Sequence, residues 1–479
     1  MSARAIAAAA AVALVAPAAA RAEAPPPPSA YNLEIFYGPA FGSSRIIGLG
    51  GAYTAIAEGA EGLLYNPAAI ANRYRYSLRW LDYDLGFDYY FFLLGDKTDF
   101  DNDRLTRYSS FSQLMFFLAP ALHLGPFSFG LNWIHQSFSL GRLNLARPSD
   151  LDVNVLHFDL GYRFFEGALV VGLGGRLLSV GLSDCTVASS FGTTRPELGV
   201  LWRPAAWPVR FGASFRTGAR PEGSPCADSP IPTPNEVIVP WELELGFAFQ
   251  LGARVFNRPW KNPRVRDKAR AKEIEAVREA RRAELRAKLS DTPPADRARV
   301  ARDWDANEKK IRAEEDELLE AWREHVADHD DARLRAEDRL HTLFSFDLLV
   351  TGPVGGALGV EAALTNAARY RAALSRPYAA PGDGVYLAPR LDGRTTLSPR
   401  LGVETEVWHD RLKVRTGTYL EPARYEGTHW RLHFTSGVEL RLFYWTPPIL
   451  LNRLGVRVGA TGDFSSRYIN LSLSVGLWH

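Results

Sequence analysis

The chain has 479 residues, and its 56 Lys and Arg nearly balance 54 Asp and Glu to give a formal net charge of +2. This balance gives no case for nucleic-acid binding. The mean hydropathy is −0.15, and no apolar run of about 18 residues follows the N-terminus, which disfavours helical membrane spans. Aromatic residues nevertheless reach 12%, which suits membrane strands that show only half of their residues to lipid.

Residues 1–22 are predicted to be a secretory signal peptide. Arg4 supplies the positive charge, Ala5–Val15 form a short apolar core, and Ala20-Arg21-Ala22 offers a cleavage site between small residues. No cysteine follows that site, so a lipoprotein is not expected. Residues 23–44 begin with four prolines at 25–28, which predict a stiff, extended segment.

Residues 45–73 are rich in Gly and Ala and carry few charges. Gly48, Gly50 and Gly51 allow close backbone approach and positive φ. Asn66-Pro67 predicts a helix boundary, because the residue before a proline avoids the helical region. The segment is therefore predicted to be a small plug.

The pattern Gly-x-Gly-Gly-Ala-Tyr followed by Tyr-Asn-Pro-Ala resembles the N-terminal hatch of FadL-type outer-membrane transporters of hydrophobic compounds. The related PorV-type barrels of a bacterial secretion system share it. In those families a methionine is common where Leu49 stands, and an acidic pair is common where Glu58 is followed by Gly59. The resemblance implies a barrel with a hatch or gate, formed here by Gly48, Gly50, Gly51, Ala52, Tyr53, Tyr65, Asn66, Pro67 and Ala68.

Residues 74–257 and 341–479 break into alternating segments separated by turns, which is typical of a membrane β-barrel. We expect an all-β membrane protein with about 14 antiparallel strands, eight before and six after an inserted helical hairpin. The expected spans are 74–85, 111–124, 127–140, 151–164, 168–182, 193–204, 208–220, 236–252, 342–352, 395–408, 411–420, 429–445, 453–463 and 467–478.

Short and long connections alternate, which predicts the orientation. Outer-membrane barrels keep short turns in the periplasm and long loops outside. Both chain ends are then expected in the periplasm, with the barrel in the outer membrane of a Gram-negative bacterium.

Cys185 and Cys226 fall in predicted outer loops. They could form a disulfide or remain as two free thiols, and the sequence leaves both alternatives open. Tyr89–Leu94, in the first loop, is either a landing groove for a hydrophobic ligand or an aromatic belt on a longer first strand.

The final strand predicts which face meets lipid. Ile469, Leu471, Leu473, Val475 and Leu477 share the face expected to contact lipid, and the polar residues between them share the lumenal face. Trp478, followed by His479, gives an atypical form of the terminal aromatic signal for barrel insertion. A soluble sandwich strand would alternate in the same way.

The third strand changes the phase of its apolar residues, which predicts a bulge or kink. The resemblance implies that a kink here opens a lateral exit into the bilayer, and an ordinary bulge is the alternative. His135 has no second ligand at useful spacing, so no metal site is expected. The residues at the slip are Ile134, His135, Gln136 and Ser137.

Charged residues are predicted inside the barrel. Arg400, Glu404 and Glu406 should face Lys413 and Arg415, beside Arg411, and form a ladder of ion pairs. A ligand carboxylate bound by Arg400 or Arg415 is the functional alternative. Arg176, Arg216 and Asp347 are further lumenal candidates with the same two interpretations, and Met115 and Phe117 are expected to line an apolar path.

Residues 258–340 are predicted to form an antiparallel helical hairpin in the periplasm. Residues 258–290 carry a net charge of +7 and residues 291–340 a net charge of −6, on either side of Pro293-Pro294. Trp304, Ile311, Leu318, Trp322 and Val326 form a coiled-coil-like stripe. The hairpin is either a solvated insertion or a dock for a periplasmic protein.

No catalytic motif is present in the sequence, and we expect neither an enzyme nor a cofactor. The leading hypothesis is passive uptake of a hydrophobic molecule, such as a long-chain fatty acid or a hydrocarbon, through a hatch-gated barrel surrounded by outer-membrane lipid. The alternative is a PorV-like structural or secretion-associated barrel that binds other proteins.

Overall fold

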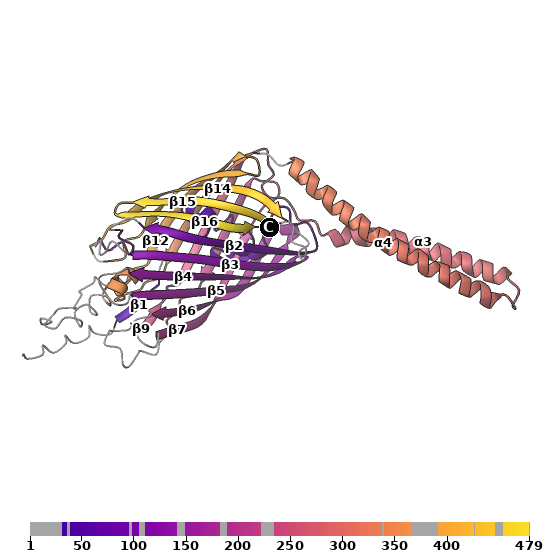
Figure 1. Ribbon diagram of the computed structural model, residues 1–479, viewed down its shortest axis with the longest axis horizontal. Coiled ribbons are helices and arrows are strands. Elements are labelled where there is room, and N and C mark those ends of the chain that lie inside the picture. Colours follow the sequence, from indigo (N-terminus) through magenta and orange to yellow (C-terminus); the bar gives the residue numbers. More distant parts are fainter. Residues whose placement is uncertain are drawn as a thin grey trace, which may run out of the picture.

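The computed structural model describes residues 31–35, 39–94, 98–104, 111–140, 149–182, 189–221, 234–337, 340–365, 367, 391–425, 427–445 and 454–478. The predicted signal peptide, the prolines at 25–28, Cys185, Cys226 and His479 lie outside these residues. In the described residues, fourteen antiparallel strands close a barrel (Figure 1). They are β2 (Leu81–Leu94), β3 (Phe111–Leu124), β4 (Phe127–Leu140), β5 (Ser149–Phe164), β6 (Leu169–Leu182), β7 (Ser189–Trp202), β8 (Val209–Arg216), β10 (Glu242–Gly252), β11 (His341–Thr351), β12 (Thr396–Trp408), β13 (Leu412–Glu421), β14 (Arg431–Trp445), β15 (Leu454–Ser465) and β16 (Tyr468–Trp478).

The barrel has two different ends. One carries the C-terminus and a long helical hairpin and is called the hairpin end; the opposite end, with the long connections, is called the loop end (Figure 1). The predicted first strand, 74–85, is displaced: β2 runs from Leu81 to Leu94, so Tyr89–Leu94 belong to the strand and not to a loop groove. Tyr90 faces inward and is buried, whereas Phe91 faces outward.

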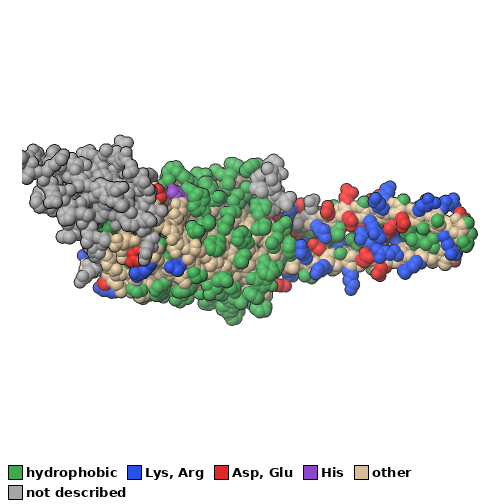
Figure 2. Space-filling model, turned by 90° about the horizontal axis from the view of Figure 1, so that it is seen from below, with side chains coloured by type: hydrophobic (Ala, Val, Ile, Leu, Met, Phe, Trp, Pro, Cys, Tyr) green, Lys and Arg blue, Asp and Glu red, His purple; other side chains and the backbone are tan. Residues whose placement is uncertain are grey.

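The barrel wall separates an apolar exterior from a polar interior. On β16, Leu471, Leu473 and Val475 are 45–56% exposed, while Asn470 and Ser472 face inward and are buried. Hydrophobic side chains cover the visible outer wall between the two ends (Figure 2). An apolar belt around a closed sheet is the surface that contacts lipid in a membrane barrel, so the predicted facing is confirmed.

The N-terminal residues lie at the unexpected end. β1 (Tyr31–Glu34) pairs in parallel with β9 (Pro234–Ile238), in the loop-end connection between β8 and β10. Residues 31–35 therefore lie at the loop end, and the prediction that both chain ends share the other side is wrong for them. The predicted strand 236–252 is likewise two strands, because β9 leaves the barrel wall to pair with β1.

The predicted kink in the third strand is absent. β4 pairs with β5 in one unbroken register, and Ile134–Ser137 also pair without a shift with β3. The phase of apolar residues changes because the environment changes: Ile134, Gln136 and Phe138 face a buried interior, while His135 and Ser137 lie outside. A break in the β3–β4 pairing lies instead at Ala119 and Pro120, where proline has no N–H to donate.

The insertion is a helical hairpin that extends away from the barrel (Figure 1). It consists of α3 (Pro263–Asp291) and α4 (Arg297–Glu337). Opposite charges join the helices: Arg278 Nε lies 2.8 Å from Glu315 Oε2, and Arg266 Nη1 lies 3.0 Å from Asp330 Oδ2. Among the described residues, no helix is both long and apolar enough to cross a membrane.

The stripe predicted on α4 is wrong at one position. Leu318 is 68% exposed, whereas Leu319 lies on the less exposed side with Glu308, Ile311 and Glu315. The two glutamates occupy that side because arginines of α3 pair with them, so charge and not a continuous apolar seam defines the contact between the helices.

We expect the barrel to fold without most of the hairpin. No described residue of α3 is buried, and exposed ion pairs contribute at most about 1 kcal/mol each. Arg266 and Asp330 lie side by side on the two helices, so a short Gly/Ser linker can join them in place of residues 267–329. This replacement should shift the melting temperature by less than about 3 °C. Heat-dependent gel mobility in detergent checks that the barrel forms, and loss of the compact band would show that the hairpin is needed for folding.

Candidate functional site: the hatch and the lumen

Residues 39–80 thread through the lumen and form the hatch. It contains α2 (Ser44–Gly48) and two 3-10 turns, η1 (Ala60–Leu64) and η2 (Pro67–Ala71). Gly50 and Gly51 have positive φ values of 63° and 74°. A Cβ on Gly51 would lie 2.8 Å from Arg400 Nη1, and one on Gly48 would lie 3.2 Å from Gly437 Cα. These predicted hatch glycines therefore allow the hatch to touch the wall.

Asn66 holds both the hatch and the wall. Its side-chain oxygen accepts a hydrogen bond from Ala68 N at 3.0 Å, which caps η2. Its amide Nδ2 donates to Thr54 O and to Val200 O on β7, each at 3.1 Å. Tyr65 donates its hydroxyl to Phe41 O at 2.9 Å. Asn66 and Tyr65, both predicted as gate residues, thus fix the conformation of the hatch.

Asp347 attaches the hatch to β11. One of its carboxylate oxygens accepts hydrogen bonds from the backbone N–H groups of Tyr53 and Thr54, at 2.7 and 2.6 Å. Arg400 lies nearby, pairs with Glu244 at 3.2 Å and donates to Gly51 O. Asp347 and Arg400, two of the predicted lumenal candidates, are therefore engaged by the protein itself.

Glu404 is the centre of the predicted ion-pair ladder. It accepts two hydrogen bonds from Arg45 of the hatch, at 2.9 and 3.1 Å, and one from Arg415 at 2.7 Å. Lys413 lies 3.9 Å away, and Arg415 also binds Glu439 at 2.8 Å. The ladder is thus present, and it includes the hatch, which the strand pattern did not predict.

Two members of the predicted ladder have other partners. Glu406 lies 3.5 Å from His341 and 3.8 Å from His409, because it sits near the hairpin end of β12, below the hatch contact. Arg411 lies in the tight turn before β13 and donates to the backbone carbonyls of Arg441 and Leu442, so its expected place beside the ladder is wrong.

Glu58 gives the hatch a pH-dependent contact. Its carboxylate lies 3.0 Å from Arg210 and 3.5 Å from Arg45. Burial alone would raise the pKa of Glu58, but these positive charges outweigh burial and lower that pKa to about 2. Because the folded pKa lies below the unfolded value of about 4.3, ionised Glu58 stabilises the protein above about pH 4, and this contribution is lost as the pH falls toward about 2.

Glu58→Gln should therefore lower the melting temperature at pH 6, by on the order of 3 °C, and should have little effect near pH 2. The measurement is thermal unfolding in detergent across this pH range, with Glu166→Gln on an exposed turn as the control. An equal effect of Glu58→Gln at both pH values would contradict the ionic contact.

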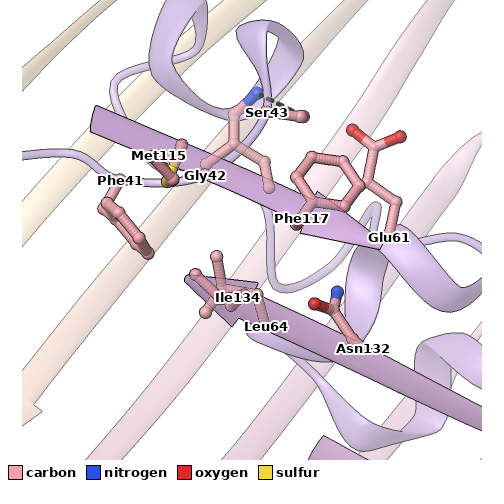
Figure 3. A pocket seen from close by; sticks show the side chains of 10 residues that line it. Phe41, Gly42, Ser43, Glu61, Leu64, Met115, Phe117, Asn132 and Ile134 are labelled. Carbon is pink, nitrogen blue, oxygen red and sulfur yellow. Dashed lines mark hydrogen bonds between the residues drawn. The ribbon is translucent and has the colours of Figure 1, made fainter. Parts of the chain in front are cut away.

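Two adjacent cavities lie between the hatch and the wall. The hatch cavity has about 210 Å³ of empty space, its open mouth included, and brings Met115 and Phe117 of β3 together with Phe41 and Leu64 of the hatch (Figure 3). The main cavity encloses about 660 Å³, its open mouth included. Phe41, Leu64 and Ile134 line both cavities. Met115 and Phe117 thus lie beside an apolar space, as the sequence predicts.

The main cavity has an apolar and a polar part. Its apolar lining residues are Ile35, Phe41, Leu64, Ile134, Val155, Leu178, Ala219 and Val239. The predicted candidates Arg176 and Arg216 lie on its polar part, where both approach Glu242, at 3.6 and 3.7 Å. Arg195 lines the same cavity, is exposed, and forms no ion pair with a described residue.

Sequence reasoning missed most of the lining. Ile35 and Phe41 both precede the predicted plug. Val155 and His157 come from a strand on which no inward residue was singled out, and Leu178 comes from one on which only Arg176 was. One signal was available. In an ordinary membrane barrel the inward residues of a strand are polar and the outward residues apolar, whereas near the loop end of β4 and β5 the inward residues are a mixture of apolar and polar side chains.

No family model matches the sequence, and no curated protein matches it. The structure is similar to the CymD monoaromatic hydrocarbon channel, with a TM-score of 0.44 and 11% identity over 92% of this chain and 98% of that chain. It is similar to the Ralstonia pickettii toluene transporter TbuX, with a TM-score of 0.44 and 11% identity over 93% and 99%. It is also similar to a Pseudomonas aeruginosa FadL homologue, with a TM-score of 0.42 and 10% identity over 91% of this chain and 96% of that chain.

Proposed function

We propose that this chain forms a channel in the outer membrane of a Gram-negative bacterium for the passive uptake of small hydrophobic molecules. The main cavity carries the proposal. It is lined by eight apolar side chains together with a smaller set of polar ones, which is the make-up usual for the binding site of a small, largely apolar ligand. The hatch fills other parts of the lumen with buried apolar clusters and ion pairs, whereas this space between the hatch and the wall is left open.

The hatch supplies a gate. Phe41 and Leu64 line the main cavity and the hatch cavity alike, so a shift of this segment changes the passage between the two. The bonds of Asn66 to Thr54 and Val200 hold the segment in place, and replacing Asn66 is expected to alter uptake while the barrel remains. The chain offers no energy source, so movement through the gate runs down the concentration gradient.

The ligand is mainly apolar. Two classes of ligand, hydrocarbons and fatty acids, differ in whether they carry a charged head group. A hydrocarbon needs only the apolar side of the main cavity. A fatty acid needs a cation for its carboxylate, and Arg195 is available there, whereas Arg176 and Arg216 already lie near Glu242. Arg195→Ala should therefore reduce uptake of a long-chain fatty acid but not of toluene if the channel takes both.

Filling the main cavity tests the proposal. Val155→Trp places a larger side chain in the cavity wall, and Leu160→Trp places the same side chain on the outer face of the same strand, where Leu160 is 64% exposed. We expect Val155→Trp to reduce the uptake of labelled toluene or oleate by cells at least fivefold, and Leu160→Trp to leave it unchanged. Equal uptake by both variants at equal barrel content would contradict the proposal.

A structural or secretion-associated barrel is the second candidate, and the hairpin favours it. α4 alone is about 60 Å long, and the hairpin extends beyond the barrel with its length exposed (Figure 1). A barrel of this kind requires the hairpin for binding a protein but does not require the main cavity. It would show no uptake above background in any variant.

A further inference from the structure

A buried cluster of potential metal ligands lies in the barrel wall beside the main cavity. His157 and Asp159 face the lumen from β5, and Glu197 faces it from β7. One ligand atom from each of the three lies within 4.8 Å of the others. Each residue is at most 2% exposed. Imidazole and carboxylate are ligands that Zn²⁺ and neighbouring divalent transition metals bind in proteins.

Several potential ligand atoms in this cluster have no hydrogen-bond partner. His157 Nδ1 lies 2.8 Å from Glu197 Oε1, but His157 Nε2, Glu197 Oε2 and both carboxylate oxygens of Asp159 have no hydrogen-bond partner. Buried polar atoms without partners are costly. A cation at this point would be bound by one ligand atom from each of the three residues and would neutralise the two carboxylates.

Charge and space point the same way. Arg216 Nε lies 3.4 Å from Glu197 Oε2, and Arg176 also lies close enough to act on this carboxylate. Arg216 is shared with Glu244 and Arg176 with Glu242, so four carboxylates compete for these two arginines when Asp159 is included. Gly174 on β6 lies between the two ligand-bearing strands, and a Cβ there would be 2.2 Å from Asp159 Oδ1. The absence of a side chain at this position leaves the room that Asp159 occupies.

We propose that His157, Asp159 and Glu197 bind one divalent transition-metal ion of the Zn²⁺ class. The ion links β5 to β7 across β6, close to where η2 contacts all three strands. Three protein ligands leave a fourth position of a tetrahedral site. Because His157 also lines the main cavity, that position is available to water or to a polar group of a bound molecule. The pairing of the consecutive strands β5, β6 and β7 brings Glu197 beside Asp159, and no sequence motif joins these positions.

The test uses full-length protein without a polyhistidine tag, purified in detergent and dialysed against chelator. After incubation with Zn²⁺ and gel filtration, elemental analysis should find one Zn²⁺ per chain, and Co²⁺ should give the visible absorption of a low-coordinate site. Asp159→Asn keeps the side-chain volume and should weaken Zn²⁺ binding at least 100-fold by calorimetry, and His157→Gln should act similarly.

His135→Gln is the matched control, because His135 lies on the outer side of neighbouring β4 and bonds to Asn154. It should bind Zn²⁺ like the wild type, and heat-dependent gel mobility confirms that each variant forms the barrel. The proposal is overturned if wild-type protein retains no Zn²⁺, or if Asp159→Asn binds it as tightly as wild type. An increase in melting temperature in Asp159→Asn without any Zn²⁺ effect would indicate that the two carboxylates share a proton instead.

Discussion

Glu404→Ala is expected to release the hatch from the barrel wall. Glu404 is fully buried and binds Arg45 and Arg415, with Lys413 nearby. Its removal leaves three cations close together, and only Glu58 and Glu439 remain to balance Arg45 and Arg415. Breaking a buried pair from one side costs about 3 kcal/mol or more. The backbone pairing of β12 with β11 and β13 is unchanged, so the barrel should still form while the hatch loses the bond from Arg45 to β12.

The measurement is the labelling rate of a cysteine introduced at the buried Ala69 of η2, in a background where Cys185 and Cys226 are serines. Glu404→Ala should raise this rate at least tenfold and lower the melting temperature. Glu406→Ala is the control: it removes a buried carboxylate from the same strand, but the neighbours of Glu406 are His341, His409 and the cross-strand Lys413, and none of them belongs to the hatch. Similar labelling in both variants would show that Glu404 does not hold the hatch.

The barrel was predictable because alternation along each strand reports the environment on its two sides. The expected spans 111–124 and 127–140 coincide with β3 and β4, where turn residues and aromatics mark both ends. The same signal misplaced β2: the expected strand ended at residue 85, and the residues from Gly86 on were assigned to a loop, although Asp88 faces inward and pairs with Arg457.

The position of the N-terminal residues was not predictable from local pattern. β1 pairs with β9 across some 200 positions, and nothing in either short segment encodes that partner. For the same reason β9 was merged with β10. The third-strand slip was read as a change in backbone geometry, although β4 keeps its register and the polarity of the two sides of the wall changes instead.

The lumenal site was predictable only within neighbouring strands. The pairing of Arg415 with Glu404 follows from the expected adjacency of β12 and β13. The bonds of Arg45 to Glu404, and of Asp347 to Tyr53 and Thr54, join the wall to the hatch. They depend on how deep the hatch sits in the barrel, which glycine spacing alone does not specify.

Gly172→Val is expected to displace the hatch by a different route, because it introduces bulk and removes no charge. A Cβ on Gly172 of β6 would lie 2.2 Å from Pro67 O and 2.4 Å from Ala68 N. Both contacts are to backbone, so a rotamer change cannot relieve them, and η2 must move away from the wall. The ladder of β6 with β5 and β7 needs no change, so the barrel should still form.

Gly181→Val on the same strand is the control, since a Cβ there meets no atom within 4 Å. In planar bilayers, Gly172→Val should raise the ionic conductance at least tenfold over wild type, and Gly181→Val should leave it unchanged. The Ala69→Cys label separates movement from gating. If that label reports a displaced hatch while the conductance stays at the wild-type level, the hatch fills the lumen without closing a path, and its role as the gate is wrong.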